Sequence, residues 1–195
     1  MLTERESSWH PFFNRLADLL DTSGSKVRDL ELVPGTLLPK TEPVVRHLLR
    51  ALDLATAPTV AVCAQLSSLR GTLHWRQNSS YTDRDFLDRY AYCELLGPNG
   101  HWRHVDLALG LLLLGPGVTY PEHVHPAAET YVVLSGDGEW RQGHGQWRQH
   151  FPGDIIAHVS MEPHAMRTGS EPLLAAYLWR DHLHEPARLL SRAEF

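Results

Sequence analysis

The sequence of 195 residues lacks the charge and the long apolar runs that nucleic-acid-binding and membrane proteins need. Its 18 lysines and arginines are outnumbered by 23 aspartates and glutamates, which gives a formal charge of −5. No overall positive field therefore exists to hold nucleic acid or an anionic membrane surface. The longest apolar run, residues 107–114, contains Gly110 and is far too short to span a bilayer. We expect no nucleic-acid partner and no membrane partner.

Cysteine is also scarce. Cys63 and Cys93 are the 2 cysteines, and no C-x-x-C pair occurs, so each is predicted to be a buried free thiol in a reducing compartment. Residues 1–7 carry two acids and no apolar stretch of a secretory signal, so a cytoplasmic location is expected. Hydrophobic residues make up 43% and charged residues 21%, which is typical of a globular chain with one domain and an extension.

The first part of the chain has helical periodicity. Apolar residues between positions 9 and 20 recur every three or four residues and predict one helix with an apolar face. Thr41 is a candidate cap for a second helix with Pro43 in its first turn, and residues 56–69 predict a third. We interpret residues 1–85 as a helical extension, with turns at 24–25 and 33–35. Its apolar stripes need cover from a barrel exterior or from a second subunit, which would make a homodimer.

From about residue 90 the periodicity changes to the alternation that is typical of β-strands. Residues 105–113 have an apolar side chain at every second position. Glycine and proline turns then separate further short runs, which are 130–134, 138–141, 146–151, 154–158, 164–168 and 173–179. Many short strands joined by such turns predict a sandwich or a closed barrel over residues 86–195.

Histidine is the residue present in excess, with 13 copies, and it is the commonest side-chain ligand of transition metals. His123 and His125 are two positions apart, so on an extended strand both rings point to one face. Glu129 follows a turn that can bring its carboxylate to the same point. Two imidazoles and a carboxylate leave room for a fourth ligand, for which we favour His164 over His158. The other candidates are predicted to lie at the surface: His101, His104, His144, His150, His182 and His184.

The sequence around these residues resembles the first motif of the cupin superfamily. That motif is a glycine, five residues, His-x-His, three or four residues, a glutamate, six residues and a glycine. Gly117, the two histidines at 123 and 125, Glu129 and Gly136 fit each position. The second cupin motif is matched loosely by residues 151–154 and 163–164, with Thr168 where an asparagine is expected. The resemblance implies a mainly β fold, a single cupin (double-stranded β-helix or jelly-roll) barrel, with the helical extension at its N-terminus.

A narrower resemblance is to the bacterial cupin-type dimethylsulfoniopropionate (DMSP) lyases. It is carried by the run from Tyr120 to Tyr131, by the segment 90–97, and by the length and helical first half. The resemblance implies cleavage of DMSP, a small molecule, into dimethyl sulfide and acrylate. It also implies one divalent transition metal, such as zinc, iron or manganese, held by the candidate ligands.

The residues near the ligands suit this reaction. Elimination removes a weakly acidic proton beside the substrate carboxylate, so a base and a polarising cation are both needed. Tyr131 is the first candidate for the base, and Tyr120 is the second; both are expected to contact substrate. A sulfonium cation prefers aromatic faces, and Tyr177 and Trp179 share one strand face that can wall the pocket.

Three other cupin functions are the alternatives, and the first of them uses the same ligands. A metal-dependent cupin dioxygenase would also keep open positions on the metal, but it would lose activity without oxygen. A non-catalytic small-molecule-binding cupin usually carries a DNA-binding helix-turn-helix, and the acidic N-terminal helices lack the basic face which that role needs. A sugar isomerase would need a more polar pocket than these aromatic residues provide.

Overall fold

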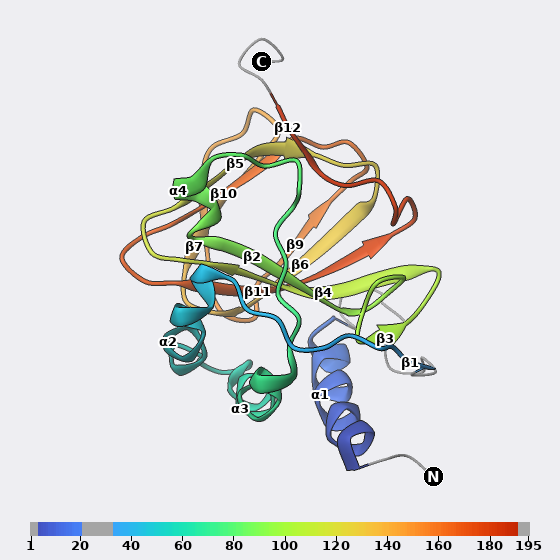
Figure 1. Cartoon of the computed structure of the whole chain (residues 1–195). Coiled ribbons are helices and arrows are strands. Elements are labelled where there is room, and N and C mark those ends of the chain that lie inside the picture. Colours follow the sequence, from blue (N-terminus) through green and yellow to red (C-terminus); the bar gives the residue numbers. More distant parts are fainter. Residues whose placement is uncertain (1–3, 21–32, 191–195) are drawn as a thin grey trace.

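Two β-sheets face each other and close into a barrel, with helices packed along one side (Figure 1). This computed structural model describes residues 4–20 and 33–190. Its 12 described strands confirm the prediction of a mainly β barrel. The turn expected at 24–25 lies outside the described residues. No helix in the described part of the chain is both long enough and apolar enough to cross a membrane.

The larger sheet has seven strands and the smaller has five. In spatial order the larger sheet contains β1 (Val33–Pro34), β3 (Trp102–Arg103), β2 (Tyr90–Leu96), β4 (Leu107–Leu114), β11 (Leu173–Arg180), β6 (Ala128–Ser135) and β9 (Ile155–His158). The smaller sheet contains β12 (Arg188–Leu189), β5 (Thr119–Val124), β10 (His164–Thr168), β7 (Gly138–Gln142) and β8 (Arg148–His150).

Each central strand of the larger sheet divides its side chains between two cores. On β4, Leu109 and Leu111 belong to the core that faces the helices, whereas Leu112 and Leu114 belong to the core inside the barrel. On β11, Tyr177 faces the interior in the same way. Because both faces of these strands are covered, they are apolar almost throughout, as buried strands are. Side-chain alternation thus sets which residues can line an interior site.

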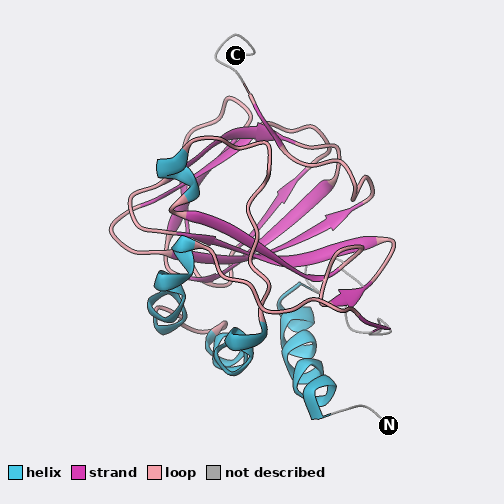
Figure 2. Cartoon of the chain, in the orientation of Figure 1, coloured by secondary structure: helices cyan, strands magenta, loops and turns pink. Residues whose placement is uncertain are grey.

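Apart from the short α4 (Arg84–Leu87), whose Phe86 packs in the core inside the barrel, the helices lie on the outer face of the larger sheet, away from the smaller one (Figure 2). They are α1 (Glu4–Leu20), the 3₁₀ helix η2 (Pro43–His47), α2 (Leu48–Asp53), α3 (Val60–Leu69) and the 3₁₀ helix η3 (Arg70–Thr72). Phe12, Leu16 and Leu66 share one buried core with Leu109 and Leu111 of β4. We propose from this shared core that residues 1–85 form an extension that covers the barrel.

Three local expectations were wrong. The second helix is not capped by Thr41: it begins as a 3₁₀ turn at Pro43, with Glu42 as the N-cap residue in an extended conformation. The third helix begins at Val60 rather than near residue 56, after a turn ending at Thr59. Residues 33–34, expected in a turn, pair with β3 as a short strand. Residues 33–34 form a strand because they pair with β3, which lies far away in the sequence, and local sequence does not indicate such a pairing.

The shared core predicts that the helical layer stabilises the whole fold. Replacing Leu66 with alanine removes a side chain that is 0% exposed, so it should lower the free energy of unfolding by about 2–5 kcal/mol. Leu49→Ala is the matched control: that leucine lies on α2 and is 54% exposed, so the loss should be below about 0.5 kcal/mol. Denaturant unfolding measures both. Equal stability of the two variants would contradict a common core for helices and barrel.

Candidate functional site

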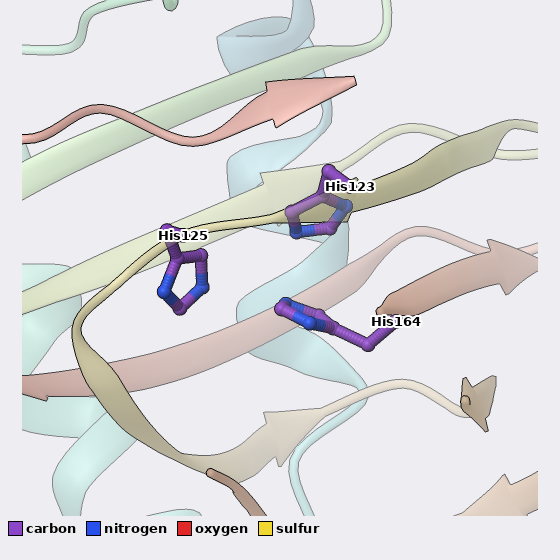
Figure 3. A group of neighbouring side chains, drawn as sticks. All are labelled: His123, His125 and His164. Carbon is purple, nitrogen blue, oxygen red and sulfur yellow. The ribbon is translucent and has the colours of Figure 1, made fainter. Parts of the chain in front are cut away.

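Three histidines from the smaller sheet point their rings toward one another (Figure 3). His123 lies on β5, His125 follows directly after that strand, and His164 begins β10. His164 pairs with His123 across the two antiparallel strands, which brings residues 41 positions apart into contact. One ring nitrogen from each histidine lies within 4.8 Å of the others, and all three side chains are buried. The structure therefore brings together the three histidines that the sequence predicted as ligands.

The second nitrogen of each ring shows which atom is available to a metal ion. Nδ1 of His123 lies 2.8 Å from the carbonyl oxygen of Pro121, and Nδ1 of His125 lies 2.9 Å from that of Ala127. Nδ1 of His164 lies 2.9 Å from the carbonyl oxygen of Glu162. A carbonyl can only accept, so each Nδ1 carries the proton and Nε2 is left to face the cluster. Metal-binding histidines are held in this way.

Glu129 joins the cluster from the other sheet. Its Oε2 lies 3.0 Å from Nε2 of His125 and 3.3 Å from Nε2 of His164, and its Oε1 accepts a hydrogen bond of 2.5 Å from the indole of Trp179. Burial alone would raise the pKa of Glu129. The adjacent rings of His125 and His164 outweigh that effect, so the pKa of Glu129 lies well below its ordinary value.

The cluster has the properties of a cation site. Both ring nitrogens of His125 face oxygen atoms, the carbonyl of Ala127 at 2.9 Å and the carboxylate of Glu129 at 3.0 Å. Nε2 of His164 is buried and has no hydrogen-bond partner among the described residues. Burial, and then the neighbouring His164, lower the pKa of His123 well below its ordinary value, so this ring is neutral. Three imidazole nitrogens and one carboxylate oxygen fit a divalent transition metal.

His158, the alternative fourth ligand, lies behind the cluster and not in it. Its ring stacks on that of His164 with centroids 4.0 Å apart, and its Nδ1 lies 3.0 Å from Oε2 of Glu162. The group of converging ligand nitrogens contains His164 and does not contain His158. The structure therefore favours His164, as the sequence did.

The two candidate tyrosines lie next to different members of the cluster, Tyr120 next to His123 and Tyr131 next to Glu129. The ring of Tyr120 stacks on that of His123, with centroids 4.0 Å apart, and its hydroxyl lies 2.8 Å from the hydroxyl of Tyr81. Tyr131 lies on β6, two residues after Glu129. Burial, followed by the charge of Glu129, raises the pKa of Tyr131 well above its ordinary value. Burial has the same effect on Tyr120. Neither hydroxyl is ionised at neutral pH without a nearby cation.

A cavity of about 340 Å³ lies inside the barrel beside this cluster. It is lined by all four residues predicted to contact substrate, Tyr120, Tyr131, Tyr177 and Trp179, and by Glu129. Residues 76–79, 183–184 and 186–187 also line it, and no sequence pattern had indicated them. Glu94 was missed too. Its position was readable, because alternation along β2 places it on the same face as Tyr90 and Tyr92.

The six histidines predicted to lie at the surface separate into three groups. His144, His182 and His184 are exposed, as expected, and His184 also lines the cavity. The surface prediction was wrong for His101, which is buried. Its ring stacks on that of Trp9 with centroids 5.4 Å apart, and its Nε2 accepts a hydrogen bond from the backbone of His74. His104 and His150 are partly buried.

Comparison with known proteins places this architecture in a family. The family model of dimethylsulfoniopropionate lyases matches residues 29–175. DddL of Cereibacter sphaeroides, which carries the name of a DMSP lyase, is 34% identical over 159 residues, 78% of this chain and 67% of that protein. DMSP lyase DddQ of Ruegeria pomeroyi is 36% identical over 171 residues, 83% of this chain and 84% of the relative.

Solved structures agree with the sequence matches. The crystal structure of DddQ from Ruegeria pomeroyi superposes with a TM-score of 0.79 at 30% identity, covering 92% of this chain and 95% of the other. A structure from a study of the DMSP lyases RdDddP and RnDddQII gives a TM-score of 0.85 at 26% identity, covering 96% and 100%. Both the cupin fold and the narrower resemblance are thereby confirmed. The chain belongs to the dimethylsulfoniopropionate lyase family.

Proposed function

We propose that this protein is a carbon–sulfur lyase that cleaves DMSP into dimethyl sulfide and acrylate. The observation that carries the proposal is the convergence of three buried imidazoles and one carboxylate beside a cavity lined by tyrosines. The names of the two relatives, DddL and DddQ, support the same substrate. In this reaction a C–H bond beside the carboxylate and the C–S bond break, a C=C bond forms, and dimethyl sulfide leaves as a neutral molecule.

The proposed cofactor is one divalent metal ion held by His123, His125, Glu129 and His164. Nitrogen and carboxylate donors of this kind suit zinc, iron and manganese, so the donor set alone does not select one of them. When bound, such an ion supplies positive charge that polarises the substrate carboxylate and favours ionisation of a neighbouring phenol. Trp179 keeps Glu129 in place, because its indole donates to the carboxylate oxygen that does not face the histidines.

The side chains around the cluster remove the proton, orient the substrate and bind its sulfonium group. Tyr131 takes the proton from the carbon beside the carboxylate, as general base. Tyr120 is fixed by its stacking on His123 and by its contact with Tyr81, so it orients substrate. Tyr177 and Trp179 offer aromatic faces to the sulfonium cation.

We infer a cytoplasmic location for the enzyme. Cys63 and Cys93 are both free and buried, and burial raises the pKa of each thiol to about 12. Such thiols persist in a reducing compartment without being reactive. A homodimer stays a prediction, since one chain alone is described.

Removing a ligand should remove the metal. His125→Ala and Glu129→Ala should each lose bound metal and dimethyl sulfide production, because each leaves an incomplete donor set. Metal analysis of purified protein and headspace detection of dimethyl sulfide give the two readouts. His144→Ala is the control, since that histidine is exposed in a turn. Wild-type metal content in both ligand variants would contradict the assignment.

Removing the proposed base should affect turnover more than binding. Tyr131→Phe deletes one hydroxyl and keeps the ring, so kcat should fall by about 10²–10⁴-fold while KM changes less. Tyr120→Phe should lose less activity. Both variants need equal metal content, because a change of occupancy would imitate the loss of a base. A near-normal rate for Tyr131→Phe beside an inactive Tyr120→Phe would reverse the two roles.

Oxygen separates the lyase from a cupin dioxygenase with the same ligands. Elimination consumes no oxidant, so dimethyl sulfide release from DMSP should proceed at an equal rate in anaerobic and aerated solutions. The assay uses metal-loaded protein in both atmospheres, with metal content measured before and after. Activity that disappears under anaerobic conditions and returns on aeration would favour the dioxygenase.

A further inference from the structure

A second buried carboxylate faces the cavity and takes no part in the proposed elimination. Glu94 lies on β2, is 9% exposed and lines the cavity. Its Oε1 accepts a hydrogen bond of 2.6 Å from the backbone N–H of Asn99. Its Oε2 has no hydrogen-bond partner among the residues that the structure describes. Oε1 therefore stabilises the turn at 97–100, and Oε2 is available to a ligand in the cavity.

The sheet places Glu94 at the opposite end of the cavity from the histidine cluster. Glu94 pairs with Gly110 on β4, Gly110 pairs with Tyr177 on β11, and Tyr177 pairs with Tyr131 on β6. Three strand spacings of about 4.8 Å therefore separate Glu94 from Tyr131, roughly 14 Å along the sheet. A substrate whose carboxylate lies at the cluster would point its other end toward Glu94.

Gly110 allows an aromatic ring to lie between the two ends. A Cβ atom at this position would collide with the phenol of Tyr177, so only glycine lets that ring cross β4 toward Glu94. Tyr92 and Trp179 also line the cavity. Aromatic faces together with an anion form a site that favours a cation over a neutral group.

The charges of basic residues act on Glu94, but none of those that the structure describes forms an ion pair with it. Arg76 lines the same cavity, but its guanidinium donates to the carbonyl oxygen of Asn99 at 3.1 Å. Within residues 33–190, no cationic nitrogen lies within ion-pair distance of the Glu94 carboxylate. Burial raises the pKa of Glu94, and the Asn99 hydrogen bond and the charge of Arg76 oppose the shift. Burying a charged carboxylate without an ion pair lowers the stability of the folded protein, because the charge loses its hydration. A bound cationic ligand would compensate for this loss.

We propose that Glu94 is a specificity-determining residue that selects substrates with a permanent positive charge over neutral carboxylic acids of the same shape. The inference rests on the proposed function for the orientation of the substrate, with its carboxylate at the histidine cluster. The cation lies over the ring of Tyr177, and the carboxylate of Glu94 stabilises it from the far side. Glu94 does not touch the reacting bonds, so it acts on binding and not on the chemical step.

Two ligands of equal shape test the proposal without turnover. One is 3-(trimethylammonio)propionate, which is cationic at its far end. The other is 4,4-dimethylpentanoate, in which a neutral carbon replaces the nitrogen. Calorimetric titration of the metal-loaded full chain gives Kd for both. The wild-type protein should bind the cationic ligand at least about tenfold more tightly, as a charge in a partly desolvated site allows.

Glu94→Gln removes the charge and keeps an oxygen that can accept from Asn99. It should weaken binding of the cationic ligand about tenfold and leave Kd of the neutral ligand within about twofold. Glu94→Asp keeps the charge and should keep most of the preference. Glu139→Gln is the control, because that glutamate is paired with Arg167 outside the cavity. In the lyase assay, Glu94→Gln should raise KM for DMSP and change kcat little.

Equal weakening of both ligands in Glu94→Gln would show a structural role and overturn the proposal. A wild-type protein without preference for the cationic ligand would overturn it as well, whether or not the variants fold. Failure of the proposed function is a separate result, seen when metal-loaded wild-type protein binds both ligands but releases no dimethyl sulfide from DMSP.

Discussion

The site depends on three hydrogen bonds from histidine Nδ1 atoms to backbone carbonyl groups. They fix the orientation of the rings at 123, 125 and 164, so that each Nε2 faces the same point. Two of the carbonyls belong to residues two positions before the histidine, and the third lies two positions after it. The orientation is therefore set locally, by the backbone at the ends of β5 and β10. Pairing of these strands then brings the two ends together. Glu129 completes the site from the opposite sheet, so the cluster also joins the two walls of the barrel.

The same barrel needs one apolar face outside and a mixed face inside. The outer face of the larger sheet is aliphatic because α1, α2 and α3 cover it. The inner face carries tyrosines, a tryptophan and two carboxylates beside aliphatic residues such as Leu112 and Leu114. Burial beneath the helices makes the sheet rigid, and rigidity keeps ligands from different strands at fixed distances.

Much of this arrangement could be predicted from local sequence. Period-two alternation and glycine or proline turns gave the strands at 138–142, 155–158 and 164–168 within a few residues, and the spacing from Gly117 to Gly136 gave the cluster. Contacts between segments that are far apart in the chain could not be predicted from local sequence. His101 is buried because Trp9, 92 positions earlier, stacks on it. Glu94 could be placed on an inner face, but its distance from the cluster follows from the order of four strands, which the sequence does not state.

Glu129 and Glu94 show how one residue type takes two roles within a single cavity. Two imidazoles lie against Glu129, so its pKa is lowered and its charge is bound to the cluster. Glu94 accepts a hydrogen bond from an amide N–H and forms no ion pair among the described residues. Burial outweighs the charges of Arg76, Arg103 and His184 and raises the pKa of Glu94, and its charge is directed into the cavity. A cation at the cluster would neutralise the first carboxylate and attract an anionic group, while the second carboxylate attracts a cationic group. The cavity is therefore electrostatically polar from end to end, which suits a ligand that carries opposite charges at its two ends and fixes the direction in which that ligand binds.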